Sequence, residues 1–418
     1  MTARLPHNGC DTLMLGFDYE LRRRGFSGNS CQIILEFTTN IDADRLARRV
    51  QSLAARHPVL AARPVRLWKP RWQPTGRPPL VRIHSGGRRP GPELFNEPLA
   101  LREGELIRFD LLDRALIFTW SHVLMDAKSA EFFLALVGNE EASGPEPGRD
   151  WYDQRARPAG NFRFRIRRAW QALERLDKFK KFLPVSLAAR RPPSAPKTLH
   201  KIVMLSVEDT RRVRENALRV CGYLGEANFH LAVTLVELHR LHVRTGCASS
   251  SYVVPIPIGL RPKGTHSPLF SNQITMMLHQ FLPAQLETVR EAAREIKSQR
   301  ADCVRDGEID SGITLAHLFR ALPLGFYMRL IKHELRGEIC SLFFGDTSMV
   351  DPALTRMFGV EITGFAHLPA MTVPPGVGIV FYHFRDRLQF TLFHAQGTLS
   401  EAEVDEFARC LQERLINP

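Results

Sequence analysis

Long apolar runs and clustered cysteines are both missing from this sequence of 418 residues. No segment approaches the roughly 20 uninterrupted apolar residues that a membrane-spanning helix needs, and the N-terminal segment lacks the apolar core of a signal peptide. The seven cysteines stand singly and far apart, which argues against a disulfide framework or a cysteine-rich metal site. We therefore expect a cytoplasmic protein with reduced thiols and no bound metal.

Several signatures of catalysis and nucleic-acid binding are missing too. The sequence has no Gly-x-Ser-x-Gly motif and no Cys-x-x-Cys pair, so it gives no sign of a covalent enzyme nucleophile. It also lacks a helix-turn-helix, zinc or aromatic RNA-binding signature, so we expect no nucleic-acid partner. The formal net charge of +13 nevertheless requires a solvated surface or an acidic partner, such as anionic lipid, the phosphates of coenzyme A or an acidic carrier protein.

What the sequence contains is two stretches of similar size that each mix strands with helices. The chain is too long for one ordinary core, and the Pro-rich segment 190–197 cannot form regular structure. We predict an N-terminal subdomain at 1–189 and a C-terminal subdomain at 198–418, joined by 190–197. Each is expected to be an α/β (α+β) unit with a mixed sheet flanked by helices.

Apolar periodicity predicts the individual elements. Strands are expected at 31–38, 59–67, 80–83, 106–112, 116–120, 200–206, 252–258 and 338–344, and at 376–394 as a hairpin that turns at 385–387. Helices are expected at 13–23, 42–57, 127–138, 162–183, 209–219, 228–242 and 288–304, and after Ser400. Segment 315–335 is predicted as one helix or as two divided at Pro323, and the Gly- and Pro-rich segment 139–160 as a loop.

The segment 162–183 is predicted to be a basic amphipathic helix. Its apolar residues recur at spacings of three and four and form one stripe, made of Phe162, Ile166, Trp170, Leu173, Leu176 and Phe179. Arginines and lysines occupy much of the remaining surface. Such a helix can lie on anionic lipid or dock a carrier protein. We favour the alternative, in which the stripe packs on the body of the protein and the arginines face water.

A histidine follows the apolar strand 116–120, and an aspartate follows it four residues later. His122 and Asp126 thus lie in a short turn between a core strand and a core helix, where polar side chains are held on a rigid scaffold. The same spacing also occurs at His7 and Asp11, with no strand before it, so spacing alone decides little. On this stretch alone, His122 is equally well interpreted as a catalytic residue or as a buried core histidine, with Asp126 as a helix N-cap.

Several separated segments together resemble the coenzyme-A-dependent acyltransferase superfamily with the chloramphenicol-acetyltransferase fold. This superfamily includes nonribosomal peptide condensation domains, wax ester/diacylglycerol synthases and polyketide-associated acyltransferases. Its His-His-x-x-x-Asp-Gly motif stands here as 121–127, with Ser121 in place of the first histidine and Ala127 in place of the glycine. The other similar segments are Arg56-His57-Pro58-Val59-Leu60, Val254 to Pro262, Phe270-Ser271-Asn272 to Pro283, and Gly345-Asp346-Thr347-Ser348.

The resemblance implies two subdomains that meet in a V, with a tunnel between them and His122 at its middle. It implies that His122 is the general base, and that Asp126 pairs with Arg261 to fix the turn. Further candidates for substrate or oxyanion contacts are Ser121, Asn272, Thr347 and Ser348.

The implied reaction moves an acyl group from acyl-CoA or acyl-phosphopantetheine to a small hydroxyl or amine acceptor, in bacterial secondary or lipid metabolism, without a permanently bound cofactor. Two alternatives stay open. Because of Ser121 and Ala127, the protein can instead be an inactive condensation-like module that binds an acidic acyl carrier protein, or a membrane surface through 162–183. A basic nucleic-acid binder is the third interpretation.

Overall fold

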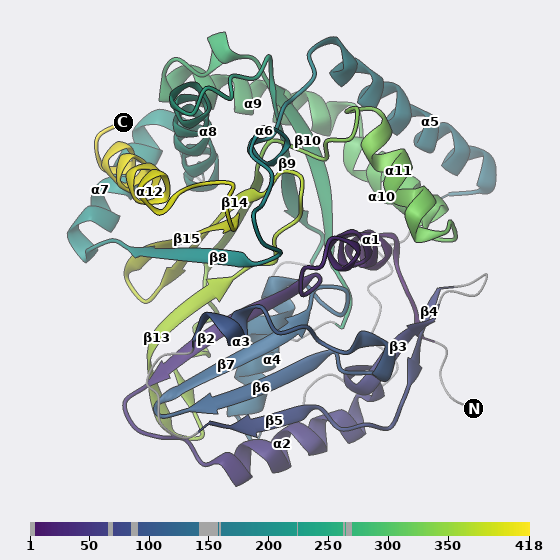
Figure 1. Ribbon diagram of the computed structural model, residues 1–418, viewed down its shortest axis with the longest axis vertical. Helices are drawn as coiled ribbons and strands as arrows, with labels where there is room; N and C mark the ends of the chain where they lie inside the picture. The colour runs from purple at the N-terminus through teal and green to yellow at the C-terminus, as the bar shows by residue number, and fades with distance from the viewer. Residues whose placement is uncertain are drawn as a thin grey trace.

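Two β-sheets, one in each lobe of the molecule, carry the fold (Figure 1). The computed structural model describes residues 5–65, 70–84, 91–141, 158, 160–223, 225–261, 264 and 270–418. Helix α1 (Gly9–Arg23) lies where the lobes meet, and strand β13 (Val360–Leu368) extends from the C-terminal lobe into the N-terminal one. The expected α/β fold of two subdomains, each with a sheet flanked by helices, is confirmed.

The N-terminal sheet has six strands in the order β12-β13-β2-β7-β6-β5, and only β5 runs parallel to its neighbour. Besides β13, they are β2 (Ser30–Phe37), β5 (Leu80–Ile83), β6 (Ile107–Leu112), β7 (Ala115–Ser121) and β12 (Arg356–Met357). Along β7, Leu116, Phe118 and Trp120 alternate to one face and are fully buried. They join one core with apolar side chains of α2 (Ala43–Arg56) and α4 (Ala127–Gly138).

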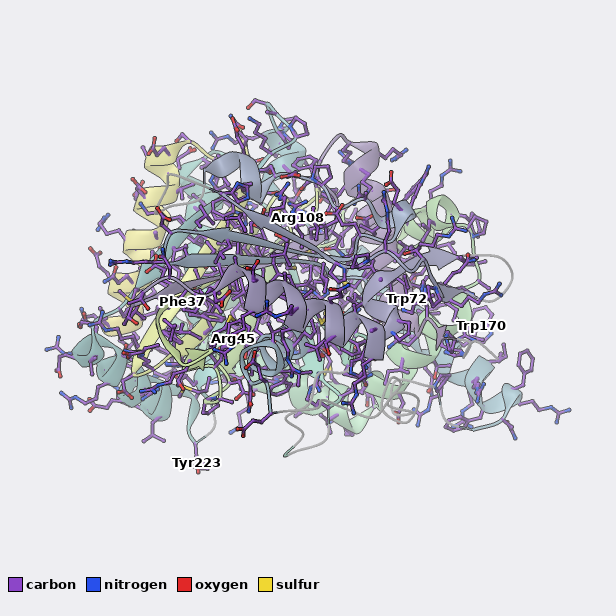
Figure 2. All side chains as sticks on the ribbon, turned by 90° about the horizontal axis from the view of Figure 1, so that it is seen from below. Phe37, Arg45, Trp72, Arg108, Trp170 and Tyr223 are labelled. Atoms are coloured by element: carbon purple, nitrogen blue, oxygen red, sulfur yellow. The ribbon has the colours of Figure 1, made fainter. Side chains whose placement is uncertain are left out.

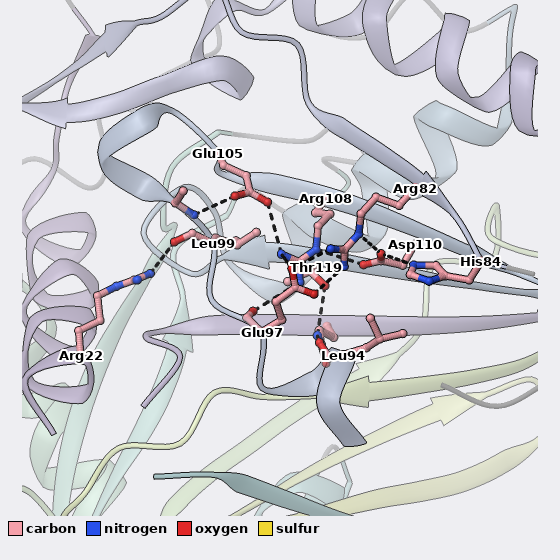
Figure 3. Close-up of polar contacts among 12 residues, drawn as sticks. Arg22, Arg82, His84, Leu94, Glu97, Leu99, Glu105, Arg108, Asp110 and Thr119 are labelled. Carbon is pink, nitrogen blue, oxygen red and sulfur yellow. Dashed lines mark hydrogen bonds and ion pairs between the residues drawn. The ribbon is translucent and has the colours of Figure 1, made fainter. Parts of the chain in front are cut away.

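The other face of this sheet carries a buried network of charges (Figure 3). Arg108 and Asp110 alternate with the core residues of β6, and each is only 1% exposed. Arg108 Nε donates to Asp110 Oδ2 at 3.1 Å, and Arg82 bridges Asp110 and Glu97 at 2.5 and 2.7 Å. Burial raises the pKa of Asp110, but the bonds from Arg82 and His84 and the charge of Arg108 lower it overall. Because Glu97 precedes β6, the network fixes that connection against the sheet.

The C-terminal sheet has four strands in the order β11-β14-β15-β8, of which only β11 and β14 run parallel to each other. Its strands are β8 (Thr198–Met204), β11 (Phe343–Met349), β14 (Val377–Phe384) and β15 (Arg387–Ala395). Around a second apolar core, this sheet packs with α7 (Val207–Cys221), α8 (Glu226–Arg244), α9 (Val289–Arg305) and α12 (Glu401–Ile416). A separate antiparallel pair consists of β9 (Tyr252–Gly259) and β10 (Ile274–Phe281).

Helices α10 (Glu308–Phe319) and α11 (Leu324–His333) lie beside α1, and α5 (Phe162–Lys178) lies farther from α1, against α10 (Figure 1). Helix α10 contacts both α1 and α5. A Cβ atom at Gly9 would lie 2.7 Å from the carbonyl carbon of Ala316 and from the backbone nitrogen of His317, so α1 approaches α10 this closely only because residue 9 is a glycine. This tight contact fixes the start of α1, which carries part of the site described below.

Short elements complete the fold. They are β1 (Leu5–Pro6), β3 (Ala62–Val65) and β4 (Arg71–Pro74), which form a small sheet, the helices α3 (Pro92–Phe95) and α6 (Leu187–Arg190), and 3-10 turns at Pro58–Ala61, Leu101–Glu103, Phe179–Lys181 and Pro283–Gln285. Within the described ranges, no helix is both long and apolar enough to cross a bilayer.

Three element predictions need correction. Strand β13 was not expected, because Gly364 and a register shift after Ile362 interrupt its alternation. Strand β11 is Phe343–Met349 and not 338–344, and α10 already begins at Glu308. The division at Pro323 is confirmed, since α11 starts directly after it. Of the expected strand 59–67 and loop 139–160, positions 66–67, 142–157 and 159 lie outside the described residues.

The division of the chain into 1–189, 190–197 and 198–418 stays a prediction. Strands β12 and β13 follow residue 198 in the sequence but complete the N-terminal sheet, so the two sheets do not follow this division strictly. The expected linker is held by backbone hydrogen bonds. Ser194 N donates to Gln396 O at 2.8 Å, and Gln396 N donates to Lys197 O at 2.9 Å.

Candidate active site

The turn that carries His122 is fixed at both ends by local hydrogen bonds. Strand β7 ends at Ser121, whose hydroxyl accepts a hydrogen bond from Val123 N at 3.3 Å. His122 N donates to Asn29 O at 2.9 Å, which ties the turn to the chain before β2. Asp126 then caps α4, because its Oδ1 accepts from Ser129 N at 2.8 Å. The predicted strand, turn and helix around His122 are therefore confirmed.

The side-chain amide of Asn272 fixes which ring nitrogen of His122 carries the hydrogen. Asn272 Nδ2 donates to Asp11 Oδ1 at 3.0 Å and to the His122 carbonyl oxygen at 2.8 Å, so both amide hydrogens are used. The amide oxygen therefore faces His122 Nδ1, 3.0 Å away, and accepts its hydrogen. Nε2 of the neutral imidazole is thus left with a lone pair, which can accept a proton.

Burial also keeps the imidazole uncharged. It lowers the pKa of His122 below its ordinary 6.5. A hydrogen bond with its own backbone, the negative charge of Asp126 and the hydrogen bond with Asn272 offset only part of this effect. At neutral pH the ring is therefore in the state in which an imidazole can remove a proton from a hydroxyl or amine.

Asp11 on α1 supports this arrangement, and the sequence did not identify it. Its Oδ1 accepts from both Asn272 N (2.8 Å) and Asn272 Nδ2, while its Oδ2 accepts from Asn8 N at 2.9 Å. Burial raises the pKa of Asp11 to about 6 although these three donors act in the opposite direction. The Asn8 and Asp11 spacing is that of a capping box, which predicts a helix start. No local pattern indicates the bond to Asn272.

Asp126 joins the turn to the C-terminal lobe. Its Oδ2 accepts from Gln273 N at 2.9 Å, and its Oδ1 lies 3.5 Å from Arg261 Nη2. The expected contact between Asp126 and Arg261 is therefore present, but the shorter bond of Arg261 goes to Ser129 Oγ at 2.5 Å. The guanidinium also lies over the ring of Phe132, 5.1 Å from its centroid. Asp126 thus acts on the turn through two backbone N–H groups as well as through the arginine.

His122 lines a cavity of about 400 Å³ between the two lobes, which we call the His122 cavity. Its wall also contains Asp126, Ala127, Lys128, Gly259, Arg261, Gln273, Asp346, Thr347 and Ser348. The expected substrate contacts divide into two groups. Thr347 and Ser348 lie in the wall, whereas Ser121 and Asn272 are fully buried and do not line it. Ser121 and Asn272 instead hold the turn and the imidazole.

Strand β13 adds a second histidine to this wall. His367 is buried and stacks on Trp120 of β7, with ring centroids 5.8 Å apart. Burial, together with the nearby His122, lowers the pKa of His367 to about 3. The sequence pattern does not indicate this histidine, because it does not predict β13.

Two of the segments that resemble the superfamily, 56–60 and 270–272, contact each other. The ring of His57 packs against Phe270, with centroids 5.1 Å apart, and Phe270 contacts Phe133 of α4 at 6.0 Å. Burial lowers the pKa of His57 to about 4, so this histidine is a neutral packing residue. Its contact with Phe270 places the segment that carries Asn272. Among the described residues, no group of three or more His, Cys, Asp or Glu side chains could hold a metal ion.

Replacing Asp126 by alanine is expected to destabilise the protein. The variant removes the cap of α4 and leaves Gln273 N and Arg261 without this acceptor, and breaking a buried ion pair typically costs about 3–5 kcal/mol. We therefore expect a loss of about 3 kcal/mol in the free energy of unfolding, measured by denaturant titration. Asp126→Asn, which keeps one acceptor oxygen for the cap, should lose less. A fully stable but inactive Asp126→Ala protein would instead indicate a direct catalytic role.

Comparison with known proteins supports the fold. No protein-family profile and no curated protein matches the chain. Solved structures do match over its whole length. A trichothecene 15-O-acetyltransferase from Fusarium sporotrichioides has a TM-score of 0.71 at 12% identity, covering 99% of this chain and 95% of that one. The first condensation domain of the CDA synthetase has a TM-score of 0.72 at 16% identity, covering 100% and 97%.

Polyketide synthase associated protein 5 from Mycobacterium tuberculosis is also similar, with a TM-score of 0.65 at 13% identity and 96% of each chain covered. These three proteins are an acetyltransferase, a condensation domain and a polyketide-associated protein, and each matches this chain over almost its whole length. The protein therefore has the fold that these acetyltransferase, condensation-domain and polyketide-associated structures have in common.

Proposed function

We propose that this protein is an acyltransferase that moves an acyl group from a thioester to a hydroxyl or amine acceptor. The observation that carries the proposal is the state of His122, a neutral imidazole in the wall of an interior cavity, whose Nδ1 hydrogen is engaged by Asn272. The general base of this reaction needs a free Nε2 that can be reached by substrate. The fold similarity to an acetyltransferase and to condensation domains supports the same class of reaction.

In the proposed mechanism, Nε2 of His122 removes the proton of the acceptor as its oxygen or nitrogen attacks the thioester carbonyl. The new bond forms, and the carbonyl oxygen becomes an oxyanion. When this intermediate collapses, the C–S bond breaks and the thiolate leaves with the proton from the imidazolium. Asn272 and Asp11 hold the tautomer, and Asp126 with Arg261 holds the turn. The leaving thiolate is stable, so no covalent enzyme intermediate is required.

The donor is proposed to be acyl-CoA or an acyl-phosphopantetheine on an acidic acyl carrier protein, and the acceptor a small molecule. Neither is a permanently bound cofactor. Thr347 and Ser348 are the wall residues from which we expect contacts to the substrate, because they lie in the same cavity as His122. Ala127, in place of glycine, also lies in this wall, so its methyl group borders the space that substrate would fill.

Replacing His122 by alanine should abolish acyl transfer and leave the fold intact. General-base catalysis contributes about 10²–10⁴-fold to a rate, so turnover of acyl-CoA or carrier-bound thioester should fall by at least a hundredfold, measured as thiol release. His84→Ala, which removes a histidine that does not line the cavity, is the matched control and should keep activity. Unchanged turnover in the His122 variant would remove this residue from the mechanism. Absence of thioester consumption by the wild-type protein would favour the inactive binding module.

The pH dependence of kcat/KM should show an acid limb below pH 6.5. The base is active when neutral, and burial lowers its pKa, so activity should be lost only as the pH falls through that lowered value. Because the bond with Asn272 raises the pKa of His122, Asn272→Ala should move the limb to still lower pH and reduce kcat. An acid limb above pH 6.5 in the wild-type protein would contradict this account.

We also propose that the N-terminal half of α5 contacts anionic membrane lipid. The predicted stripe divides in the structure, because Leu173, Leu176 and Phe179 face the interior while Phe162 (71% exposed) and Trp170 (61% exposed) face solvent. Figure 2 shows Trp170 at the edge of the molecule. The expectation that the whole stripe packs on the body is thus met only in its C-terminal part.

The charges around this exposed half suit an anionic surface. Arg163 and Arg167 are exposed beside Phe162 and Trp170, and the whole chain carries +13. Apolar rings flanked by arginines are typical of helices that lie in a membrane interface.

The double variant Phe162→Ser/Trp170→Ser should weaken sedimentation with phosphatidylglycerol-containing vesicles by about tenfold or more, because each large apolar side chain is worth about 1.5–3 kcal/mol when buried. Tyr223→Ser is the matched control, since Tyr223 is 86% exposed on another face. Equal binding of wild-type protein to neutral phosphatidylcholine vesicles, or equal loss in the control, would argue against this contact.

A further inference from the structure

A second cavity adjoins the His122 cavity. Its volume of about 450 Å³ lies within the range of small-molecule sites, about 300–1,000 Å³. The two cavities share four wall residues, Phe17, Ile274, Met276 and Phe343. These side chains border both spaces, so the second space lies next to the region that a substrate held at His122 would occupy. We call this space the chain cavity.

The wall of the chain cavity is mainly apolar and comes mostly from four helices and from strands β9, β10 and β11. Its apolar members include Leu13 and Phe17 of α1, Leu173 and Leu176 of α5, Ile313 and Phe319 of α10, Leu330 and Ile331 of α11, and Leu278 of β10. Such a wall favours a ligand that buries hydrocarbon. It is much less suited to the hydroxyls and phosphates of a nucleotide.

The charged groups at this wall hold α5 in place. Arg175 lies 2.7 Å from Asp306 and 2.8 Å from Glu308, which joins α5 to the start of α10. Lys180, just after α5, lies 2.5 Å from Glu334, just after α11. These ion pairs fix the C-terminal half of α5 as one side of the cavity. The side of α5 that faces inward there is the apolar stripe.

We propose that the chain cavity binds an unbranched alkyl chain that is part of the substrate held at His122. The chain belongs either to a fatty acyl donor or to a fatty alcohol or amine acceptor, since both present the same hydrocarbon to this wall. The inference rests on the proposed acyl transfer and names its substrate class. Each methylene buried in an apolar site tightens binding by about fourfold, so affinity should rise steeply with chain length until the cavity is full.

Gly312 offers a way to fill the cavity. It lies on α10 in the wall, and a Cβ atom there would meet Thr275 Oγ1 only at 3.5 Å, an ordinary contact. Gly312→Phe should therefore place a ring in the space that the chain would occupy. Ala301→Phe adds a similar ring on the exposed surface of α9 and is the matched control. Leu173→Trp fills the cavity from α5 and replaces Gly312→Phe if that variant does not fold.

The experiment measures binding by calorimetry in the His122→Ala background, where no turnover interferes. One series uses acetyl-, octanoyl- and dodecanoyl-CoA, and the other uses butanol, octanol and dodecanol. We expect one series to show at least a hundredfold rise in affinity with length. Gly312→Phe or Leu173→Trp should reduce the binding of its longest member by at least tenfold, while Ala301→Phe should not. The series that shows the rise identifies the donor or the acceptor as the source of the chain.

Each outcome tests the chain cavity independently of the proposed acyl transfer. A flat dependence in both series, or a rise that survives both filling variants, would overturn the proposal, even if acetyl-CoA is turned over in a His122-dependent way. A length dependence that the filling variants abolish would support the chain cavity, even if the wild-type protein releases no thiol from any donor. That last result would contradict the proposed acyl transfer but support the binding site.

Discussion

The amide side chain of Asn272 is the interaction on which the site depends. It is fully buried and joins three parts of the chain, bonding to Asp11 at a separation of 261 residues and to His122 at a separation of 150. Its amide nitrogen faces only acceptors, which are Asp11 Oδ1 and the carbonyl oxygens of His122 and Val123, while its oxygen faces the ring N–H of His122. Rotating the amide by half a turn would put a donor against a donor. The orientation of Asn272 therefore also sets the tautomer of His122, and with it the position of the free lone pair.

Burial explains the shifted pKa values of both groups that bond to this amide. Burial is the largest influence on both groups, lowering the pKa of His122 and raising that of Asp11 to about 6. In each case the shift favours the uncharged form, as expected where charge cannot be solvated. The same burial would suit the proposed acyl transfer, because a thioester bound in the cavity would be shielded from water. The ionisation of the site and its apolar surroundings thus have one physical cause.

The sequence predicted those parts of the site that are built from neighbouring residues. The strand, turn and helix around His122 follow from apolar periodicity and from the N-cap at Asp126, and both signals are local. The sequence does not predict Asp11 as a site residue. Asp11 supports the site through its bond to Asn272, and no spacing within α1 indicates that bond. Strand β13 was missed because its pairing with β2 joins distant parts of the chain and is interrupted by a register shift. His367 lies on β13 and was therefore not predicted either.

Helix α5 also shows what a local sequence pattern does not predict. Residues at spacings of three and four place Phe162, Trp170 and Leu176 on one stripe, and this geometry is fixed by the helix whatever covers it. The surroundings of the stripe depend on distant parts of the chain, because Arg175 pairs with Asp306 and Glu308 at the start of α10. The stripe is enclosed near that contact and exposed toward its other end. One periodic pattern therefore serves two environments, an interior cavity and an open surface, and only the tertiary structure separates them.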